Sequence, residues 1–210
     1  MKLYDSKIAP STRRVRIFLA EKGIALETVE VDLLAGENIK PAFLKVNPRG
    51  LVPALVLDDG TCIDEVIAIC RYLEETRPGP PLMGTDPLSR ALVESRTRHM
   101  EIDGFSQVAD VFRNSTPGFE KRALAGVAEP VAAIEQLVDR GNAGIRRYFD
   151  RLEQYLSASP YIAGDRYSIA DIAALCFVDF AGWVKQKLPE QNVHTQRWYK
   201  AVSERPSAKA

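Results

Sequence analysis

The stretch from Asn47 to Leu73 combines the backbone features that could hold a small anionic peptide. Its loop contains a proline and a glycine and leads through Val52-Pro53 into a short apolar strand. Asp58-Asp59-Gly60-Thr61 then predicts a hairpin turn, because Asp-Gly adopts positive φ readily. The pattern changes to that of a helix at Asp64, and the backbone N–H groups at the start of a helix favour anions. Together these features predict a backbone platform for such a ligand.

The first 77 residues predict a small α/β domain with mixed strand directions. Its first two strands are joined by a helix and should be parallel, with a right-handed crossover. Ser11 or Thr12 can cap that helix, and Gly23 ends it. The expected strands cover residues 2–4, 25–32, 54–57 and 62–63, and the expected helices cover 11–22, 41–45 and the residues from 64 onward.

Residues 78–86 contain three prolines and two glycines and predict the linker between two domains. Strand patterns largely disappear beyond it, so residues 87–210 predict an all-helical domain. Ser168 and Asp171 form the pattern of a capping box, and Asp171 is therefore expected to be structural. Gly141 and Gly144 could divide one of the helices. The expected helices cover residues 87–113, 131–156, 172–183 and about 195–205.

The composition is that of a soluble globular protein and excludes several other classes. The 210 residues carry 28 basic and 28 acidic side chains, and zero net charge argues against nucleic acid or an anionic membrane as the main partner. No apolar run approaches the ~20 residues that span a bilayer, and the N-terminus lacks the apolar region of a signal peptide. Cys62, Cys70 and Cys176 are expected to be reduced core residues of a cytoplasmic protein. His99 and His194 lack partners at metal-ligand spacing, so no metal site is expected.

These features, in this order, resemble the soluble glutathione transferases over essentially the whole chain, with bacterial-like, theta- and zeta-type traits. The resemblance implies a thioredoxin-like α/β domain at 1–77 and an all-α domain at 87–210, which is the glutathione transferase fold. The segments that carry it are Lys2-Leu3-Tyr4, Arg14-Val15-Arg16-Ile17, Ala20-Glu21-Lys22-Gly23, Asn47-Pro48, Val52-Pro53, Ala68-Ile69, Arg71-Tyr72-Leu73, Ser168-Ile169-Ala170-Asp171 and Arg197-Trp198-Tyr199.

The resemblance also implies how glutathione, the co-substrate, would bind. Pro53 would follow a cis peptide bond, so that the Val52 backbone pairs with the cysteinyl part. Glu65 would meet the γ-glutamyl ammonium, while the backbone amides of Glu65 and Val66 receive the carboxylate at that end. Asn38 falls where family members direct a polar group towards the glycyl carboxylate. The alternative for Asp64 and Glu65 is helix capping alone.

Three positions depart from the family pattern. Ala9 stands where serine-type members have a serine, Val66 replaces the serine after the glutamate, and Leu51 replaces the Lys or Gln that often precedes Val-Pro. Each lost charge-assisted hydrogen bond could cost about 1.5–3 kcal/mol. These departures leave mainly backbone contacts for glutathione.

The implied reaction needs a glutathione thiolate, which a hydroxyl donor or a helix N-terminus stabilises. Ser11 is the expected catalytic residue and Thr12 the alternative, unless Ser11 only caps its helix. The resemblance implies a pocket for a hydrophobic electrophile, for which core packing is the competing explanation at the helical positions. Its candidate residues are Ile8, Ala9, Met100, Phe105, Val108 and Phe112.

Two hypotheses follow from this sequence. In the first, the protein is a glutathione S-transferase that conjugates small hydrophobic electrophiles and forms a homodimer, as family members usually do. In the second, it is a non-catalytic binding or interaction protein that keeps the fold with a degenerate glutathione site. The intact Val52-Pro53, Glu65 and Ser11 favour the enzyme, and the three departures favour the binding protein.

Overall fold

The computed structural model describes residues 1–210 and consists of two compact units. The first unit comprises residues 1–80, 124–130 and 210, and the second comprises 81–123 and 131–209. The chain thus passes between them inside the expected linker, at 80–81. The return of residues 124–130 to the first unit was not predicted from the sequence.

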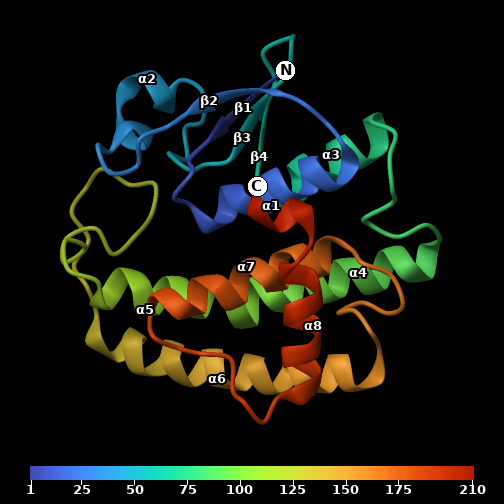
Figure 1. Ribbon diagram of the computed structural model, residues 1–210. Helices are drawn as coiled ribbons and strands as arrows, with labels where there is room; N and C mark the ends of the chain where they lie inside the picture. Colours follow the sequence, from blue (N-terminus) through green and yellow to red (C-terminus); the bar gives the residue numbers. More distant parts are fainter. The chain divides into compact units, whose positions relative to one another are not determined.

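The first unit is built on a four-stranded sheet of order β2-β1-β3-β4. β2 is parallel to β1, whereas β3 is antiparallel to both β1 and β4, which confirms the mixed directions expected. Helices α1 and α3 lie side by side along the sheet (Figure 1). The elements are β1 (Lys2–Asp5), α1 (Pro10–Lys22), β2 (Glu27–Glu30), η1 (Glu37–Ile39), α2 (Pro41–Leu44), β3 (Ala54–Val56), β4 (Cys62–Asp64) and α3 (Val66–Thr76).

The core of this unit forms where the sheet meets α1 and α3. Leu3 and Leu55 contribute from the strands, and Phe18 and Ile69 from the helices, each at most 1% exposed. The start of α1 differs from expectation, because its N-cap is Ala9 and no side chain caps it. Pro10 occupies the first turn instead, where its fixed φ suits a helix and its missing N–H costs nothing. The prediction of a Ser11 or Thr12 cap was wrong.

The regular elements of the second unit are all helices, as predicted. Helices α4 and α5 form one continuous rod through the π-helical turn η2, and α6 runs without interruption beside it (Figure 1). None of the helices combines the length and apolar character that crossing a membrane requires. The bounds are α4 (Pro87–His99), η2 (Met100–Phe105), α5 (Ser106–Ser115), α6 (Glu135–Ala158), α7 (Ile169–Trp183), α8 (Val193–Ser203) and η3 (Pro206–Lys209).

The two glycines of α6 serve close packing and do not divide the helix. A Cβ atom at Gly141 would lie 2.6 Å from the Val111 side chain, and one at Gly144 would collide with Gln107. Both neighbours belong to α5, so the glycines let α5 and α6 approach each other closely. The predicted break at these positions was therefore wrong. The two glycines instead mark the close contact between α5 and α6.

Helix α7 is the buried centre of the second unit, and Asp171 fixes its start. The capping box predicted for Ser168 and Asp171 is present, and the Asp171 side chain is fully buried. The carboxylate accepts hydrogen bonds from the Ser168 and Ile162 backbone amides at 3.0 Å and from the Trp198 indole at 2.9 Å. This one side chain thereby ties α7 to α8 and to the preceding loop.

The cysteines correspond only partly to the prediction. Cys70 and Cys176 are buried, but Cys62 is exposed on strand β4, at the edge of the sheet. Side chains alternate between the two faces of the short strand β4, and that of Cys62 points outward. The apolar residues near Cys62 in the sequence did not indicate this exposure. Partial desolvation, with a smaller contribution from Asp64, raises the pKa of the Cys62 thiol, so it stays protonated at neutral pH.

Replacing Asp171 by asparagine should destabilise the protein most at acidic pH. Burial raises the pKa of Asp171 from 3.8 to about 6, against the opposing effect of the donated hydrogen bonds. Between about pH 4 and 6 the folded state therefore binds a proton more tightly than the unfolded chain, and stability falls as the pH rises. Asparagine does not titrate, so the free-energy gap between wild type and Asp171→Asn should be roughly 2 kcal/mol larger at pH 4.5 than at pH 7. Urea unfolding at both pH values measures the gap; a larger gap at pH 7 would contradict the assignment.

Candidate functional site

The loop between α2 and β3 is held by two buried amide side chains. Asn47, 2% exposed, accepts from the Arg49 backbone N–H at 3.1 Å and donates to the Leu51 carbonyl at 2.9 Å. Asn38 donates to the Gly50 carbonyl at 2.7 Å. The carbonyls of Gly50 and Leu51, which precede Val52, therefore both have hydrogen-bond partners within the protein.

Val52 follows this clamped loop with its own backbone polar groups unpaired. The Val52–Pro53 peptide bond is cis, as the resemblance implies. Strand β3 begins only at Ala54, and the backbone N–H and C=O of Val52 make no hydrogen bond within the protein. An extended peptide can form backbone hydrogen bonds with such groups, as a strand added to a sheet does.

The N-terminus of α3 lies beside this segment, immediately after β4. Glu65 is the N-cap with φ 67° and ψ 128°, a conformation that is rare for a residue with a side chain. No side chain caps the helix, so its first backbone N–H groups remain open for an anion. The capping alternative for Asp64 and Glu65 was wrong, because neither carboxylate reaches those amides.

The Glu65 carboxylate instead faces Arg49. The Arg49 guanidinium pairs with Glu65 and also with Asp64, at 3.2 Å. Glu65, followed by Asp64, raises the pKa of Arg49. The side chains of Arg49 and Glu65 are 53% and 60% exposed, so both can exchange this contact for a ligand. The site thus offers a charge of each sign, and sequence reasoning had missed Arg49.

Asn38 does not fit the role that the resemblance implied for it. Its side chain is buried, and its amide supports Gly50 from within the fold. We correct the expectation: Asn38 positions the loop and does not face a ligand. Asn38 lies in the turn Glu37–Ile39, twelve residues before Gly50. Nothing in the sequence indicated the contact between these two residues.

A segment from the second half of the chain, Leu124–Pro130, packs on the same loop and belongs to the first unit. The two backbones cross at Gly50 and Gly126, which have φ values of 62° and 77°. A Cβ atom on Gly50 would lie 2.6 Å from the Gly126 carbonyl oxygen, and one on Gly126 would collide with the Arg49 carbonyl. Only glycine fits at either position, and the crossing braces the loop from outside.

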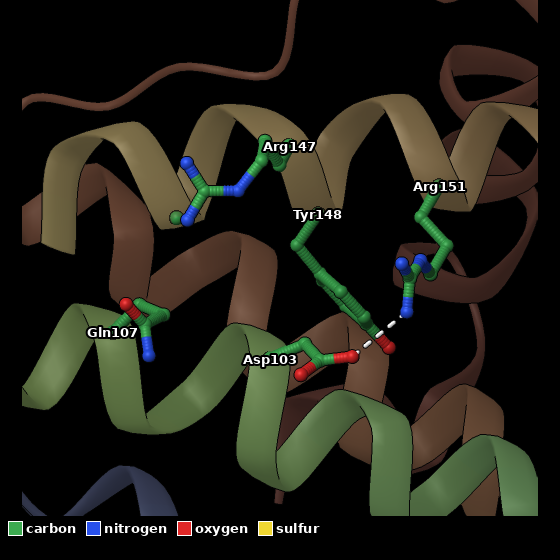
Figure 2. A pocket seen from close by; sticks show the side chains of 6 residues that line it. Asp103, Gln107, Arg147, Tyr148 and Arg151 are labelled. Carbon is green, nitrogen blue, oxygen red and sulfur yellow. Dashed lines mark hydrogen bonds and ion pairs between the residues drawn. The ribbon is translucent and has the colours of Figure 1, made fainter. Parts of the chain in front are cut away.

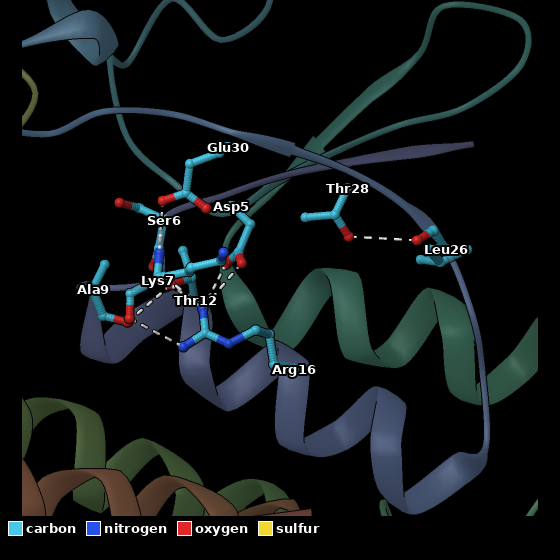
Figure 3. Close-up of polar contacts among 9 residues, drawn as sticks. All are labelled: Asp5, Ser6, Lys7, Ala9, Thr12, Arg16, Leu26, Thr28 and Glu30. Carbon is cyan, nitrogen blue, oxygen red and sulfur yellow. Dashed lines mark hydrogen bonds and ion pairs between the residues drawn. The ribbon is translucent and has the colours of Figure 1, made fainter. Parts of the chain in front are cut away.

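The turn before α1 is fixed by a buried polar cluster (Figure 3). The Asp5 carboxylate pairs with Arg16 at 2.9 Å, and Arg16 also donates to the Ser6 carbonyl at 3.2 Å. The Thr12 hydroxyl lies 2.6 Å from the Ser6 carbonyl and 2.8 Å from that of Ala9. Thr12 is 0% exposed, so it cannot meet a bound thiol. The catalytic alternative for Thr12 is therefore excluded.

Ser11 is the remaining hydroxyl in the first turn of α1. It is partly exposed, and its hydroxyl takes part in no hydrogen bond within the protein. Ala9 and the 47% exposed Ile8 come just before it in the turn. Ser11 can therefore donate to a ligand without breaking an internal contact.

The four candidates from the long helical rod divide into two kinds. Met100 and Val108 are fully buried and belong to the core of the second unit. Phe105 and Phe112 are partly exposed and pack against Phe180 in tilted and edge-on geometry, with ring centroids 5.3 and 5.6 Å away. Core packing therefore accounts for Met100 and Val108, and an aromatic cluster for the two phenylalanines.

Known families and proteins match the chain along its length. The model of the glutathione S-transferase N-terminal domain matches residues 9–76, and that of the C-terminal domain matches residues 117–206. The chain is 35% identical to glutathione S-transferase 2 of Saccharomyces cerevisiae, covering 100% of this chain and 88% of the relative. The crystal structure of a glutathione S-transferase domain-containing protein from Marinobacter aquaeolei superposes with a TM-score of 0.91 at 32% identity, covering 99% of each chain. FtsZ-localized protein A of Caulobacter vibrioides is 33% identical, with 97% of this chain and 87% of the relative covered.

Substitution of Gly126 by alanine should destabilise the protein more than the same change at Gly118. Both glycines have positive φ, at 77° and 89°, so both variants incur roughly 1–2 kcal/mol of backbone strain. Gly118 has open space around it, whereas a Cβ on Gly126 meets the Arg49 backbone. We expect Gly126→Ala to lose about 1–3 kcal/mol more than Gly118→Ala in urea unfolding. Equal losses would mean that the crossing tolerates a side chain.

Proposed function

Because the chain belongs to the glutathione S-transferase family, we propose that it joins the glutathione thiol to small hydrophobic electrophiles. Both family domains are matched over most of the chain, and glutathione is the co-substrate of that family. In the reaction the thiol loses its proton and the thiolate attacks an electrophilic carbon to form a carbon–sulfur bond; with an aryl halide, the carbon–halogen bond breaks and halide ion leaves.

The unpaired backbone of Val52 is the observation that carries this proposal. Its N–H and C=O are open while the carbonyls of Gly50 and Leu51 are satisfied, so a peptide has one place to pair. Glutathione is an anionic peptide, and its cysteinyl unit would supply the matching groups. These contacts need no side chain, and the departures at Leu51 and Val66 leave them intact.

The γ-glutamyl end of glutathione carries an ammonium and a carboxylate. Glu65 suits the ammonium, and the open amides at the start of α3 suit the carboxylate. Arg49, beside Glu65, supplies a positive charge for that carboxylate. This pair of opposite charges compensates in part for the hydroxyl missing at Val66.

The Ser11 hydroxyl is the proposed activator of the thiol. A free thiol has a pKa of about 8.5, so most of it is protonated at neutral pH. A donated hydrogen bond from Ser11, together with the N-terminus of α1, would stabilise the thiolate. Thr12 contributes by holding the turn that presents Ser11.

A second candidate function is binding without turnover. The departures at Ala9, Leu51 and Val66 favour it, and one relative is named for its localisation with FtsZ. Passage over immobilised glutathione, followed by a conjugation assay with an activated aryl halide, separates the two functions. Retention with turnover supports the enzyme. Retention without turnover supports a binding protein. If the protein is neither retained nor active, glutathione has no role.

We also propose that the protein is a cytoplasmic homodimer. Family members usually pair through the first domain and the long helix of the second, and the three cysteines are free thiols. Sedimentation as a monomer at micromolar concentration would refute the dimer.

Replacement of Ser11 by alanine should lower kcat while the protein stays folded. Losing a charge-assisted hydrogen bond of about 1.5–3 kcal/mol corresponds to a roughly 10- to 100-fold loss. The Ser11→Thr variant keeps a hydroxyl and should retain more activity than Ser11→Ala. The pH profile distinguishes this role from a structural one, because Ser11→Ala should move the pKa of bound glutathione upward. Unchanged turnover would assign thiol activation to backbone amides.

Neutralising Glu65 should weaken glutathione binding and leave the chemical step largely intact. Glu65→Gln removes the partner proposed for the ammonium, so the KM for glutathione should rise about 10-fold or more. Glu75→Gln, an exposed carboxylate near the end of the same helix, is the matched control and should leave KM unchanged. A large fall in kcat with no change in KM would contradict the assigned contact.

A further inference from the structure

The second unit contains a polar cavity of about 160 Å³ between η2–α5 and α6. Figure 2 shows its side chains projecting from the two facing helices. Nothing in the proposed glutathione reaction uses them. The lining residues are Asp103, Gln107, Gly144, Arg147, Tyr148 and Arg151.

Tyr148 brings an unpartnered hydroxyl to this cavity. The side chain is 1% exposed, and its oxygen has no hydrogen-bond partner. The ring packs edge-on against Phe177, with centroids 5.0 Å apart, so the hydroxyl cannot turn away. A buried polar group without a partner destabilises the folded protein, and a suitable ligand would supply the missing partner.

Two guanidinium groups lie on the same side of α6. Arg151 pairs with Asp103 at 2.8 Å, and both side chains are 45% exposed. Arg147, one turn earlier, is exposed and has no acidic partner in the chain. The cavity therefore carries one more positive charge than negative charge.

The backbone is shaped to hold these groups in place. Residues Met100–Phe105 form a π-helical turn, a feature that often occurs at functional sites. A Cβ on Gly104, within that turn, would lie 2.7 Å from the Tyr148 ring. A Cβ atom on Gly144 would likewise collide with the Gln107 side chain. The two glycines and the wide turn together fix the positions of the tyrosine and the glutamine.

We propose that this cavity binds a small oxyanion, a phosphate or a short carboxylate, through Arg147, the Tyr148 hydroxyl and the free N–H groups of Arg151. The donors outnumber the acceptors, because Asp103 is already engaged by Arg151 and Gln107 offers both kinds of group. Guanidinium groups match the geometry of such oxyanions. Burial raises the pKa of Tyr148, so its hydroxyl stays protonated and donates. The volume equals that of roughly five water molecules, which suits an ion of this size.

Thermal unfolding in inorganic phosphate, with chloride at matched ionic strength as reference, tests the site. At ten times the dissociation constant, phosphate should raise the midpoint by about 3–6 °C. Malonate, tested in the same way, reports whether carboxylates bind as well. No rise above the chloride reference with either anion would overturn the proposal.

Three variants locate the effect. Arg147→Gln should weaken phosphate at least 10-fold by calorimetry, whereas Arg146→Gln, an exposed neighbour outside the cavity, should leave it unchanged. Tyr148→Phe should unfold no earlier than wild type without anion, because it removes an unpaired hydroxyl, and should bind phosphate several-fold more weakly. Equal weakening in Arg146→Gln and Arg147→Gln would show general screening of surface charge and refute the site.

Sedimentation of the same samples distinguishes a free anion from a carboxylate of a second copy of the chain. Phosphate affinity that does not change with protein concentration supports a site for a free ion. If Arg147→Gln changes association and leaves phosphate affinity unchanged, the cavity accepts a protein side chain and the proposal fails.

Discussion

The candidate site depends on how a partly buried loop satisfies its backbone. A carbonyl withdrawn from water needs a partner, and here two amide side chains, Asn38 and Asn47, supply partners for Gly50 and Leu51. These hydrogen bonds hold the loop, and the next residue, Val52, keeps its polar groups open. The candidate recognition surface consists of the backbone groups that have no hydrogen-bond partner inside the protein. Such a surface is made of main chain, and it tolerates changes in the side chains around it.

Most of the fold follows from local signals in the sequence. The alternation of the strands, the Asp-Gly turn and the Ser168–Asp171 capping box each depend on residues a few positions apart, and each is present in the structure. The errors at Gly141 and Gly144 have a different origin. Glycine weakens an isolated helix, but its lack of a side chain permits close packing against α5. The sequence of one helix does not show where a neighbouring helix packs against it.

The site was predictable where the main chain forms it and unpredictable where distant side chains meet. Val52-Pro53 and the start of α3 carry recognisable patterns. The pairing of Arg49 with Glu65 joins residues on two different loops, and the Thr12 contacts depend on how the turn folds back over α1. Ser11 and Thr12 are adjacent hydroxyls, and the sequence favoured Ser11 without showing which of the two side chains is exposed. In the structure Thr12 is buried, whereas Ser11 is partly exposed.

The crossing of Gly50 and Gly126 has a consequence for the order in which the protein assembles during synthesis. The sheet and α3 leave the ribosome well before Leu124–Pro130, and at about 5–20 residues per second the delay lasts several seconds. Through this interval the loop beside Val52 has its internal amides but lacks its outer brace. Closing so long a stretch of chain costs entropy, and the segment gains its contacts only after residues 81–123 of the second unit have been synthesised. The nascent protein therefore completes its sheet early and its candidate site late.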